Sequence, residues 1–264
     1  MSIELEKAGL DRSQPIIMYS QSHPIYCNDT ETTQQSMERM LKTGHRRLPV
    51  VTRKHEFVGM ITVTDILDLF LRGQQLNDKL SLVANRDVLT SKPTDSLGVV
   101  LQKFKLSRKG AFPILEGRKL VSIVSERDIV YQFKNVDFGI KVEETMTKKP
   151  LVLKPTVKVL DAMKSVVNSH YRRLPIVDGK KLVGIITATD LMAYLKAKNF
   201  SPTILDEELG TIMIQNVQTI SKDIDLHEAI QAISKKEIGG IPVVDGNKHL
   251  EGLLTERDIL EEIV

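Results

Sequence analysis

The chain has 264 residues, 41% of them hydrophobic, and its 37 basic and 34 acidic residues leave a formal net charge of +3. This composition argues against a disordered chain, and no long block of like charges points to nucleic acid. A single cysteine, Cys27, excludes an intramolecular disulfide, and we expect it to be buried in a protein of a reducing compartment. No apolar stretch is long enough for a membrane span or a signal peptide, so we expect a soluble, cytoplasmic protein.

One pattern occurs four times along the chain. Its markers are a proline, at positions 49, 113, 175 and 242, and an aspartate, at positions 65, 128, 190 and 258. By subtraction, the prolines are 64, 62 and 67 residues apart and the aspartates 63, 62 and 68. Two markers with the same spacing indicate one structural unit repeated four times. The segments that carry them are GHRRLPVVTRKHEFVGMITVTDIL, RKGAFPILEGRKLVSIVSERDIV, HYRRLPIVDGKKLVGIITATDLM and EIGGIPVVDGNKHLEGLLTERDIL.

Each repeat predicts the same order of elements. A short apolar run, such as residues 150–153, predicts a strand, and an amphipathic helix follows, shown by Leu160, Met163 and Val167. Two strands joined by a tight turn come next, with Asp-Gly at 178–179 as the hairpin signal. A second helix begins at the shared aspartate. The predicted fold class is α/β (α+β), with the order strand, helix, strand, strand, helix. The equivalent first runs are 24–27, 87–90 and 217–220.

Repeats of this size seldom bury enough apolar surface alone, so we expect them to associate in pairs. Polar connecting segments at 73–79 and 199–208 lie inside the two pairs, and 135–141 separates the pairs. The four repeats are expected at 14–72, 80–134, 142–198 and 209–264.

The polar residues around the third repeat's hairpin suggest a nucleotide site. Thr187 is expected where strand becomes helix, so its hydroxyl and the free N–H groups of the first turn offer an anion site. Asp190 can accept two hydrogen bonds from a ribose diol, and Arg173 can bind phosphate oxygens. The alternative is a capping box, in which Thr187 and Asp190 satisfy only the helix's own donors. With Arg173 beside them, we favour ligand binding.

The four sites are not expected to be equal. The first repeat has Arg47 where the third has Arg173, but the second and fourth have Ala111 and Gly240. The Asp65 and Asp190 sites should therefore hold phosphorylated ligands best. The second and fourth repeats carry arginines on the helix side, which either replace the missing phosphate contact or hold a neighbouring carboxylate: Arg127 and Arg257.

The repeat resembles the cystathionine-β-synthase (CBS) domain. The matching residues are the strand around each shared proline and the step G-h-h-T-x-T-D (h, hydrophobic), at 59–65 and 184–190, with the variant S/T-E-R-D at 125–128 and 255–258. The resemblance covers nearly everything from residue 14 onward. It implies four CBS repeats paired into two Bateman modules, similar to stand-alone archaeal proteins and to the γ subunit of AMP-activated protein kinase.

The resemblance also implies adenosine-containing ligands (AMP, ADP, ATP or S-adenosylmethionine) bound between the repeats of a pair. The first strand of each repeat would supply the adenine slot, near Ile25, Val88, Leu151 and Gln218, and Tyr171 could stack on a base or simply pack. The complete set of expected nucleotide-binding residues is Arg47, Thr62, Thr64, Asp65, Ser125, Arg127, Asp128, Leu151, Tyr171, Arg172, Arg173, Thr187, Thr189, Asp190, Thr255, Arg257 and Asp258.

Catalytic and metal-binding patterns are missing. The sequence has no HExxH, CxxC, GxSxG or P-loop spacing, and the repeats leave no room for a catalytic domain. We therefore expect a non-enzymatic, nucleotide-sensing regulator of an unidentified protein partner, without a catalytic cofactor or metal; homodimer formation is left open. The alternatives are a scaffold with vestigial clefts, an S-adenosylmethionine-binding protein, a nucleic-acid-binding protein suggested by the Arg-Arg pairs, and a slow nucleotide hydrolase.

Overall fold

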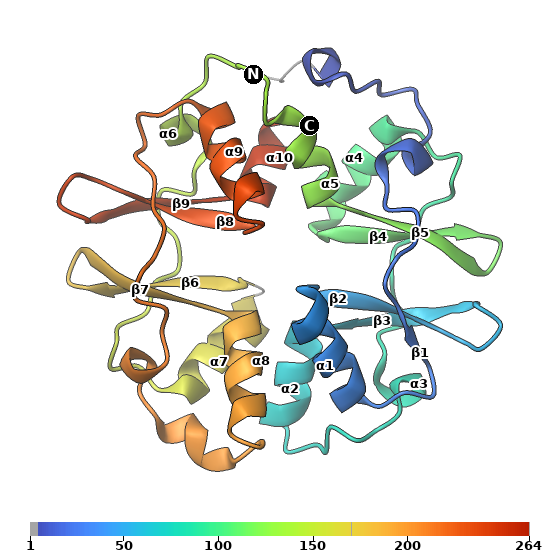
Figure 1. Ribbon diagram of the computed structural model, residues 1–264, viewed down its shortest axis with the longest axis horizontal. Coiled ribbons are helices and arrows are strands. Elements are labelled where there is room, and N and C mark those ends of the chain that lie inside the picture. Colours follow the sequence, from blue (N-terminus) through green and yellow to red (C-terminus); the bar gives the residue numbers. More distant parts are fainter. Residues whose placement is uncertain (1–4, 170, 264) are drawn as a thin grey trace. The chain divides into compact units, whose positions relative to one another are not determined.

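The computed structural model describes residues 5–169 and 171–263 (Figure 1). The chain divides into two compact units, and each unit contains two of the four repeats. Unit 1 holds the second and fourth repeats, and unit 2 holds the first and third. The compact units therefore do not coincide with the tandem pairs expected from chain order. Unit 1 is formed by Met1–Pro24, Leu89–Pro150 and Gln218–Val264, and unit 2 by Ile25–Val88 and Leu151–Val217.

Every repeat contains a helix, an antiparallel hairpin and a second helix, which confirms the predicted mixed fold. The elements of unit 2 are β1 (Cys27–Asn28), α1 (Thr33–Thr43), β2 (Arg47–Val51), β3 (Phe57–Thr62) and α2 (Val63–Leu71), with α7 (Val159–Ser169), β6 (Arg173–Asp178), β7 (Lys181–Thr187) and α8 (Ala188–Ala197). Those of unit 1 are α4 (Leu97–Ser107), β4 (Ala111–Glu116), β5 (Lys119–Ser125) and α5 (Glu126–Val130), with α9 (Leu226–Lys235), β8 (Gly240–Val244), β9 (Leu250–Thr255) and α10 (Glu256–Ile263).

The first strand of each repeat is shorter than predicted. Only β1 forms a strand, and the other three runs contribute single parallel bridges from Ser91, Leu153 and Ile220. Two residues beyond Ser91 and Leu153, where the next backbone donor of a parallel ladder would lie, the chain has Pro93 and Pro155. Proline has no N–H group, so pairing stops there.

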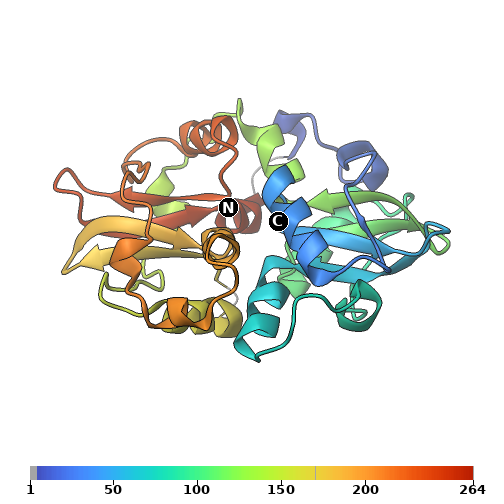
Figure 2. The same ribbon diagram turned by 60° about the horizontal axis from the view of Figure 1, so that its bottom comes forward.

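The short segment before each repeat crosses to a different hairpin. Gln21 pairs with Ile123 of β5 in unit 1, and Asn85 pairs with Met60 of β3 in unit 2. The four segments are η2 (Ile16–Tyr19), α3 (Leu80–Val83), α6 (Val142–Thr145) and η5 (Leu209–Thr211). In Figure 2 the blue segment that contains η2 runs beside the green hairpin. The later bridges, Thr147 to Leu253 and Ile214 to Ile185, repeat this exchange in the second half of the chain.

Glycine permits this close approach in the first repeat. A Cβ atom on Gly59 would lie 2.3 Å from the carbonyl oxygen of Asn85. The second repeat has Ser122 at the same hairpin position, and its hydroxyl donates to the Gln21 carbonyl at 2.6 Å. The position therefore determines how closely the crossing segment packs on the hairpin.

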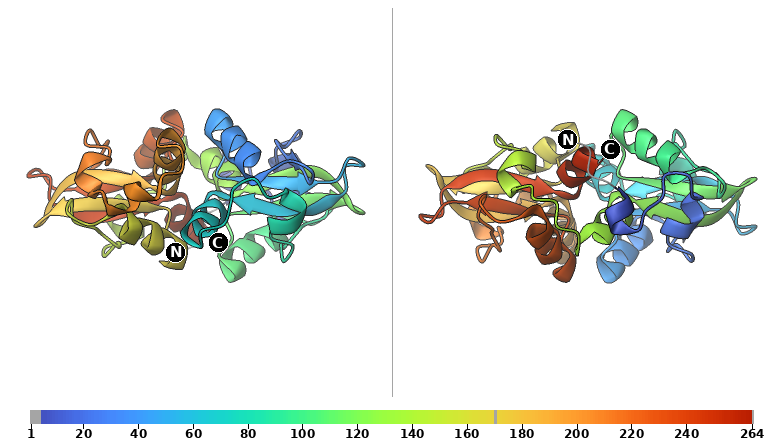
Figure 3. Two further views of the ribbon diagram at one scale, coloured as in Figure 1. Left: turned by 90° about the horizontal axis from the view of Figure 1, so that it is seen from below. Right: turned by 90° about the horizontal axis from the view of Figure 1, so that it is seen from above.

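Helices of the two repeats close each unit. In unit 2, α2 packs on α7 and α8, and Ile66, Leu67 and Leu191 are fully buried there. In unit 1, α5 lies against α10 (Figure 3). Cys27 is fully buried, as predicted, and burial raises the pKa of its thiol to about 12.

Candidate functional site

The capping box predicted as the alternative is present at Thr187 and Asp190. Thr187 is the N-cap of α8, and its N–H and hydroxyl both donate to Oδ2 of Asp190, at 2.8 and 2.7 Å. The Asp190 N–H donates back to the Thr187 hydroxyl at 3.2 Å. The helix therefore begins two residues before the aspartate, not at it as expected. Equivalent boxes join Thr62 to Asp65, Ser125 to Asp128 and Thr255 to Asp258.

Capping uses only one carboxylate oxygen, so the second oxygen decides what else each aspartate can bind. In unit 1, Oδ1 of Asp128 accepts from the Gln21 amide at 3.3 Å, and Oδ1 of Asp258 accepts from the Thr147 hydroxyl at 2.7 Å. Both donors come from the crossing segments. The protein's own side chains thus already satisfy these two carboxylates.

The third repeat differs because its crossing segment carries Ile214 at the position of Gln21 and Thr147. An isoleucine side chain has no donor. Among the residues that the structure describes, Oδ1 of Asp190 receives no side-chain hydrogen bond. This oxygen can accept a hydrogen bond from an external hydroxyl group.

Burial shifts the pKa of the two aspartates whose second oxygens accept a hydrogen bond. It raises the pKa of Asp128 and of Asp258 above the ordinary value of 3.8, against the hydrogen bonds from Ser125 and Thr255, which lower it. These carboxyl groups therefore lie in partly desolvated surroundings.

Strand register places the predicted phosphate-binding arginines beside the caps. Arg173 in β6 lies directly opposite Thr187 in β7, and Arg47 lies opposite Thr62. Paired residues of an antiparallel ladder project on the same face of the sheet. Arg173, Thr187 and Asp190 are therefore brought together, as the sequence suggested.

The second and fourth repeats lack this arrangement for different reasons. Ala111 lies opposite Ser125, where it leaves an apolar methyl group. Gly240 lies opposite Thr255, and a Cβ atom there would be 2.9 Å from the Leu254 carbonyl oxygen. The fourth repeat cannot accommodate an arginine at this position without moving its backbone.

Arg127 and Arg257 adopt the second of the two expected arrangements, in which each holds a carboxylate. Arg127 Nε donates to Glu256 at 2.7 Å, and Arg257 Nε donates to Glu126 at 2.8 Å. Burial lowers the pKa of Arg127 and the Glu256 carboxylate raises it, with a net shift above its ordinary value. At the matching positions of unit 2, Thr64 and Thr189 are half-buried in the first turns of α2 and α8.

Apolar side chains lie exposed near the starts of the first strands. Ile25 is 37% exposed and Leu151 is 38% exposed, while Tyr171, before the arginine pair, is 58% exposed. Arg172 is half-buried beside it. Exposed apolar groups next to a strand edge fit the predicted adenine slot, which remains a prediction. Of the other two neighbourhoods, Val88 is half-buried and Gln218 is exposed.

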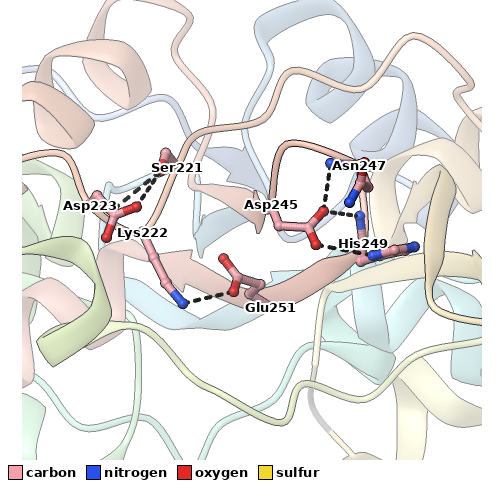
Figure 4. A network of polar contacts seen from close by, with 7 residues as sticks. All are labelled: Ser221, Lys222, Asp223, Asp245, Asn247, His249 and Glu251. Carbon is pink, nitrogen blue, oxygen red and sulfur yellow. Dashed lines mark hydrogen bonds and ion pairs between the residues drawn. The ribbon is translucent and has the colours of Figure 1, made fainter.

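Histidines and carboxylates do not gather into a metal site within residues 5–169 and 171–263. His249 instead holds a turn of the fourth repeat, where its Nδ1 lies 3.0 Å from Asp245 Oδ2 (Figure 4). The neighbouring Lys222 forms an ion pair with Glu251 at 2.9 Å. In the same described residues, every helix is too short or too polar to cross a bilayer.

Sequence reasoning missed the residues of the crossing segments. Gln21, Thr147 and Ile214 were not among the expected site residues, although Gln21 and Thr147 donate to the second oxygens of Asp128 and Asp258 and Ile214 offers Asp190 no donor. The signal was available: each lies five residues after a buried apolar residue, namely Ile16, Val142 and Leu209. Aligning the segments before the repeats would have brought these three positions into one column.

Known proteins share this architecture. An uncharacterized protein of Methanocaldococcus jannaschii, MJ1225, is 28% identical over 88% of this chain and 92% of its own length. A Thermofilum pendens protein is 28% identical over 83% of this chain and 80% of its own. An inosine-5′-monophosphate dehydrogenase of Korarchaeum cryptofilum is 27% identical over 97% of this chain but only 56% of its own length.

The crystal structure of MJ1225, which has been proposed as an archaeal homolog of g-AMPK, matches with a TM-score of 0.87 at 25% identity. That match covers 95% of this chain and all of MJ1225. The family model of the CBS domain matches four segments, 17–72, 80–135, 142–197 and 209–264. The chain therefore belongs to the CBS-domain family, as its repeats predicted.

Proposed function

We propose that this chain is a non-enzymatic regulatory protein that binds adenosine nucleotides (AMP, ADP or ATP), and that its principal site is at Asp190. The observation that carries the proposal is the pairing of Arg173 with Thr187 in strand register, together with the second oxygen of Asp190. A cation, a helix start and a carboxylate acceptor lie on one side of one repeat. A nucleotide offers a phosphate and a ribose diol that match these groups.

Each group has a defined role in this proposal. The Arg173 guanidinium and the N-terminus of α8 bind phosphate oxygens, because both present N–H donors and positive charge. Oδ1 of Asp190 accepts from a ribose hydroxyl while Oδ2 keeps its cap. Leu151 and Tyr171 supply apolar surface for the base.

The four repeats are expected to differ in affinity. Arg47 and Asp65 form the second candidate, because the first repeat shares the arginine in register with its cap. At Asp128 and Asp258, a ribose would first have to displace Gln21 or Thr147. We expect these two positions to bind weakly.

Regulation requires that ligand favour one of two states of the chain. A ligand with equal affinity for both states shifts nothing, so a partner protein can sense it only through differential binding. We propose that the ratio of AMP or ADP to ATP is what such a partner reads. The buried, protonated thiol of Cys27 is consistent with a cytoplasmic setting.

Thermal unfolding with AMP, ADP, ATP and S-adenosylmethionine tests the proposal. A ligand at one hundred times its dissociation constant stabilises a one-site protein by about 2.7 kcal/mol. Native mass spectrometry then counts the bound molecules, for which we expect one or two. Unchanged melting with every adenosine ligand would favour the scaffold, in which all four aspartates only cap helices. Release of ADP from ATP would instead identify a hydrolase.

A further inference from the structure

Two reciprocal ion pairs join the second and fourth repeats inside unit 1. Glu126 and Arg127 open α5, and Glu256 and Arg257 open α10. Arg127 donates to Glu256 at 2.7 Å, and Arg257 donates to Glu126 through Nε and Nη2, at 2.8 and 2.5 Å. Arg127 also donates to the backbone carbonyl of Glu237 at 3.1 Å. Glu126 is 2% exposed and Glu256 is 1% exposed, so each carboxylate has lost its water and depends on an arginine of the other repeat.

The matching positions of unit 2 carry no charge. Val63 and Thr64 open α2, and Ala188 and Thr189 open α8. Val63 is 1% exposed and Ala188 is 3% exposed, and both belong to the apolar core of unit 2. Each unit thus buries the first residue of both second helices. In unit 1 these first residues pair with arginine side chains, and in unit 2 they pack against apolar side chains.

This difference determines which repeats can associate. A Glu-Arg helix start packed against a Val-Thr or Ala-Thr start would bury a carboxylate without a cation, which is strongly unfavourable. Association of like with like leaves no such charge. Specificity of this kind arises from penalising the wrong partner as much as from attracting the right one.

We propose that the Glu-Arg starts of α5 and α10 form a self-complementary recognition surface, whose partner is another helix start with the same two residues. Within one chain, this surface joins the second repeat to the fourth and leaves the first to the third. The glutamate at the first position of each helix pairs with the arginine at the second position of the other helix. The contact therefore has the symmetry of an isologous pair. The surface of the second repeat therefore also fits the second repeat of another copy of this chain. The proposal does not depend on any ligand.

The test inverts the charges without changing composition or net charge. In the full-length chain, E126R/R127E places like charges opposite the unchanged fourth repeat. We expect a lower urea midpoint and, by light scattering, a doubled molar mass relative to the wild-type chain, because two inverted second repeats match each other. Inverting both repeats, with E126R/R127E/E256R/R257E, recreates both ion pairs in mirror order. We expect this variant to regain the wild-type midpoint and mass.

Two results would overturn the proposal. The first is that the E126R/R127E chain keeps the urea midpoint and the molar mass of the wild-type chain. The second is that the fourfold variant unfolds at the same urea concentration as the E126R/R127E chain, because restoring the ion pairs would then restore no stability. If the E126R/R127E chain does not fold, the fourfold variant still decides, since it folds only if the pairs recognise each other.

Discussion

Units 1 and 2 contain the same repeat twice but use its helix starts differently. In unit 1 the first turns of α5 and α10 hold buried ion pairs, and the two capping aspartates receive second hydrogen bonds from Gln21 and Thr147. In unit 2 the first turns of α2 and α8 are apolar at the interface, and an arginine lies opposite each cap. In unit 1 these arginines and capping aspartates are paired with other side chains of the same unit. In unit 2 an arginine lies beside each cap, and Oδ1 of Asp190 accepts no side-chain hydrogen bond from the residues that the structure describes.

This contrast suggests that the two units have different roles, with paired buried charges in unit 1 and ligand binding in unit 2. Buried charge is tolerated where it is fully paired, and paired charge is poor at binding ligands. A site that must exchange ligand needs polar groups whose partners are supplied from outside. The substitutions below test whether the two units differ in this way, beginning with the largest expected effect.

Removing one arginine from the ion pairs should cost most. Arg127→Ala removes the guanidinium that pairs with the carboxylate of Glu256, which is 1% exposed. Breaking a buried pair in this way destabilises a protein by about 3–5 kcal/mol. The matched change in unit 2, Thr64→Ala, should alter the free energy of unfolding by less than about 0.5 kcal/mol. Urea unfolding measures both, and similar losses would remove the contrast between the units.

The crossing segments offer a second comparison at one hairpin position. Gly59→Ala in unit 2 would place a Cβ atom 2.3 Å from the backbone oxygen of Asn85, so we expect a loss of about 3 kcal/mol. In unit 1 the same position is Ser122, whose side chain the segment already accommodates. Ser122→Gly should lose about 1 kcal/mol, mainly its hydrogen bonds to Ser20 and Gln21. Equal losses in urea unfolding would show that segment crossing is equally tight in both units.

Ligand binding should separate the aspartates of the two units. Asp190→Ala removes the proposed ribose acceptor, and we expect nucleotide affinity to fall at least tenfold, or about 1.4 kcal/mol. Asp258→Ala should leave affinity unchanged, although each variant loses about 1 kcal/mol of stability with its cap. Isothermal titration calorimetry with AMP and ATP measures the affinities. A similar loss of affinity in both variants would show that stability, not contact, controls binding.

The phosphate contact can be separated from the ribose contact. Arg173→Met removes the cation and keeps the apolar stem, so the variant should bind AMP and ATP less tightly but adenosine as well as before. Thr187→Ala serves as a comparison, because it weakens the cap of α8 and leaves the cation in place. Weaker adenosine binding by the Arg173→Met chain would show that this residue shapes the site rather than contacting phosphate.

The repeats, their helices and hairpins, and the family were all predictable, because spacing and periodicity are local properties of the chain. The expected Asp-Gly turn at 178–179 would have given Arg173 a different partner, because the turn lies at residues 179–180 and a bulge shifts the ladder between Ile176 and Val177. What could not be read was the grouping of the repeats in compact units. It depends on contacts between residues more than a hundred positions apart, such as Arg127 and Glu256. The sequence is compatible with both roles of Arg127, a phosphate contact or a pair with a neighbouring carboxylate, and only the fold decides between them.

The smallest expected effect is a pH dependence that belongs to the buried caps of unit 1. Burial raises the pKa of Asp128, so between its unfolded value near 3.8 and the higher folded value the folded chain binds more protons than the unfolded chain. The contribution of Asp128 to stability therefore falls as pH rises through that window and is constant above it. The free energy of unfolding of the wild type, minus that of Asp128→Asn, should be largest at the acid end.

Asp245 serves as the control with the opposite pH dependence, because the hydrogen bond from the His249 N–H lowers its pKa. The difference in free energy of unfolding between the wild type and Asp245→Asn should therefore grow as pH rises. Urea unfolding at several pH values measures both differences, and parallel profiles for the two variants would show that burial does not control the carboxyl group of Asp128.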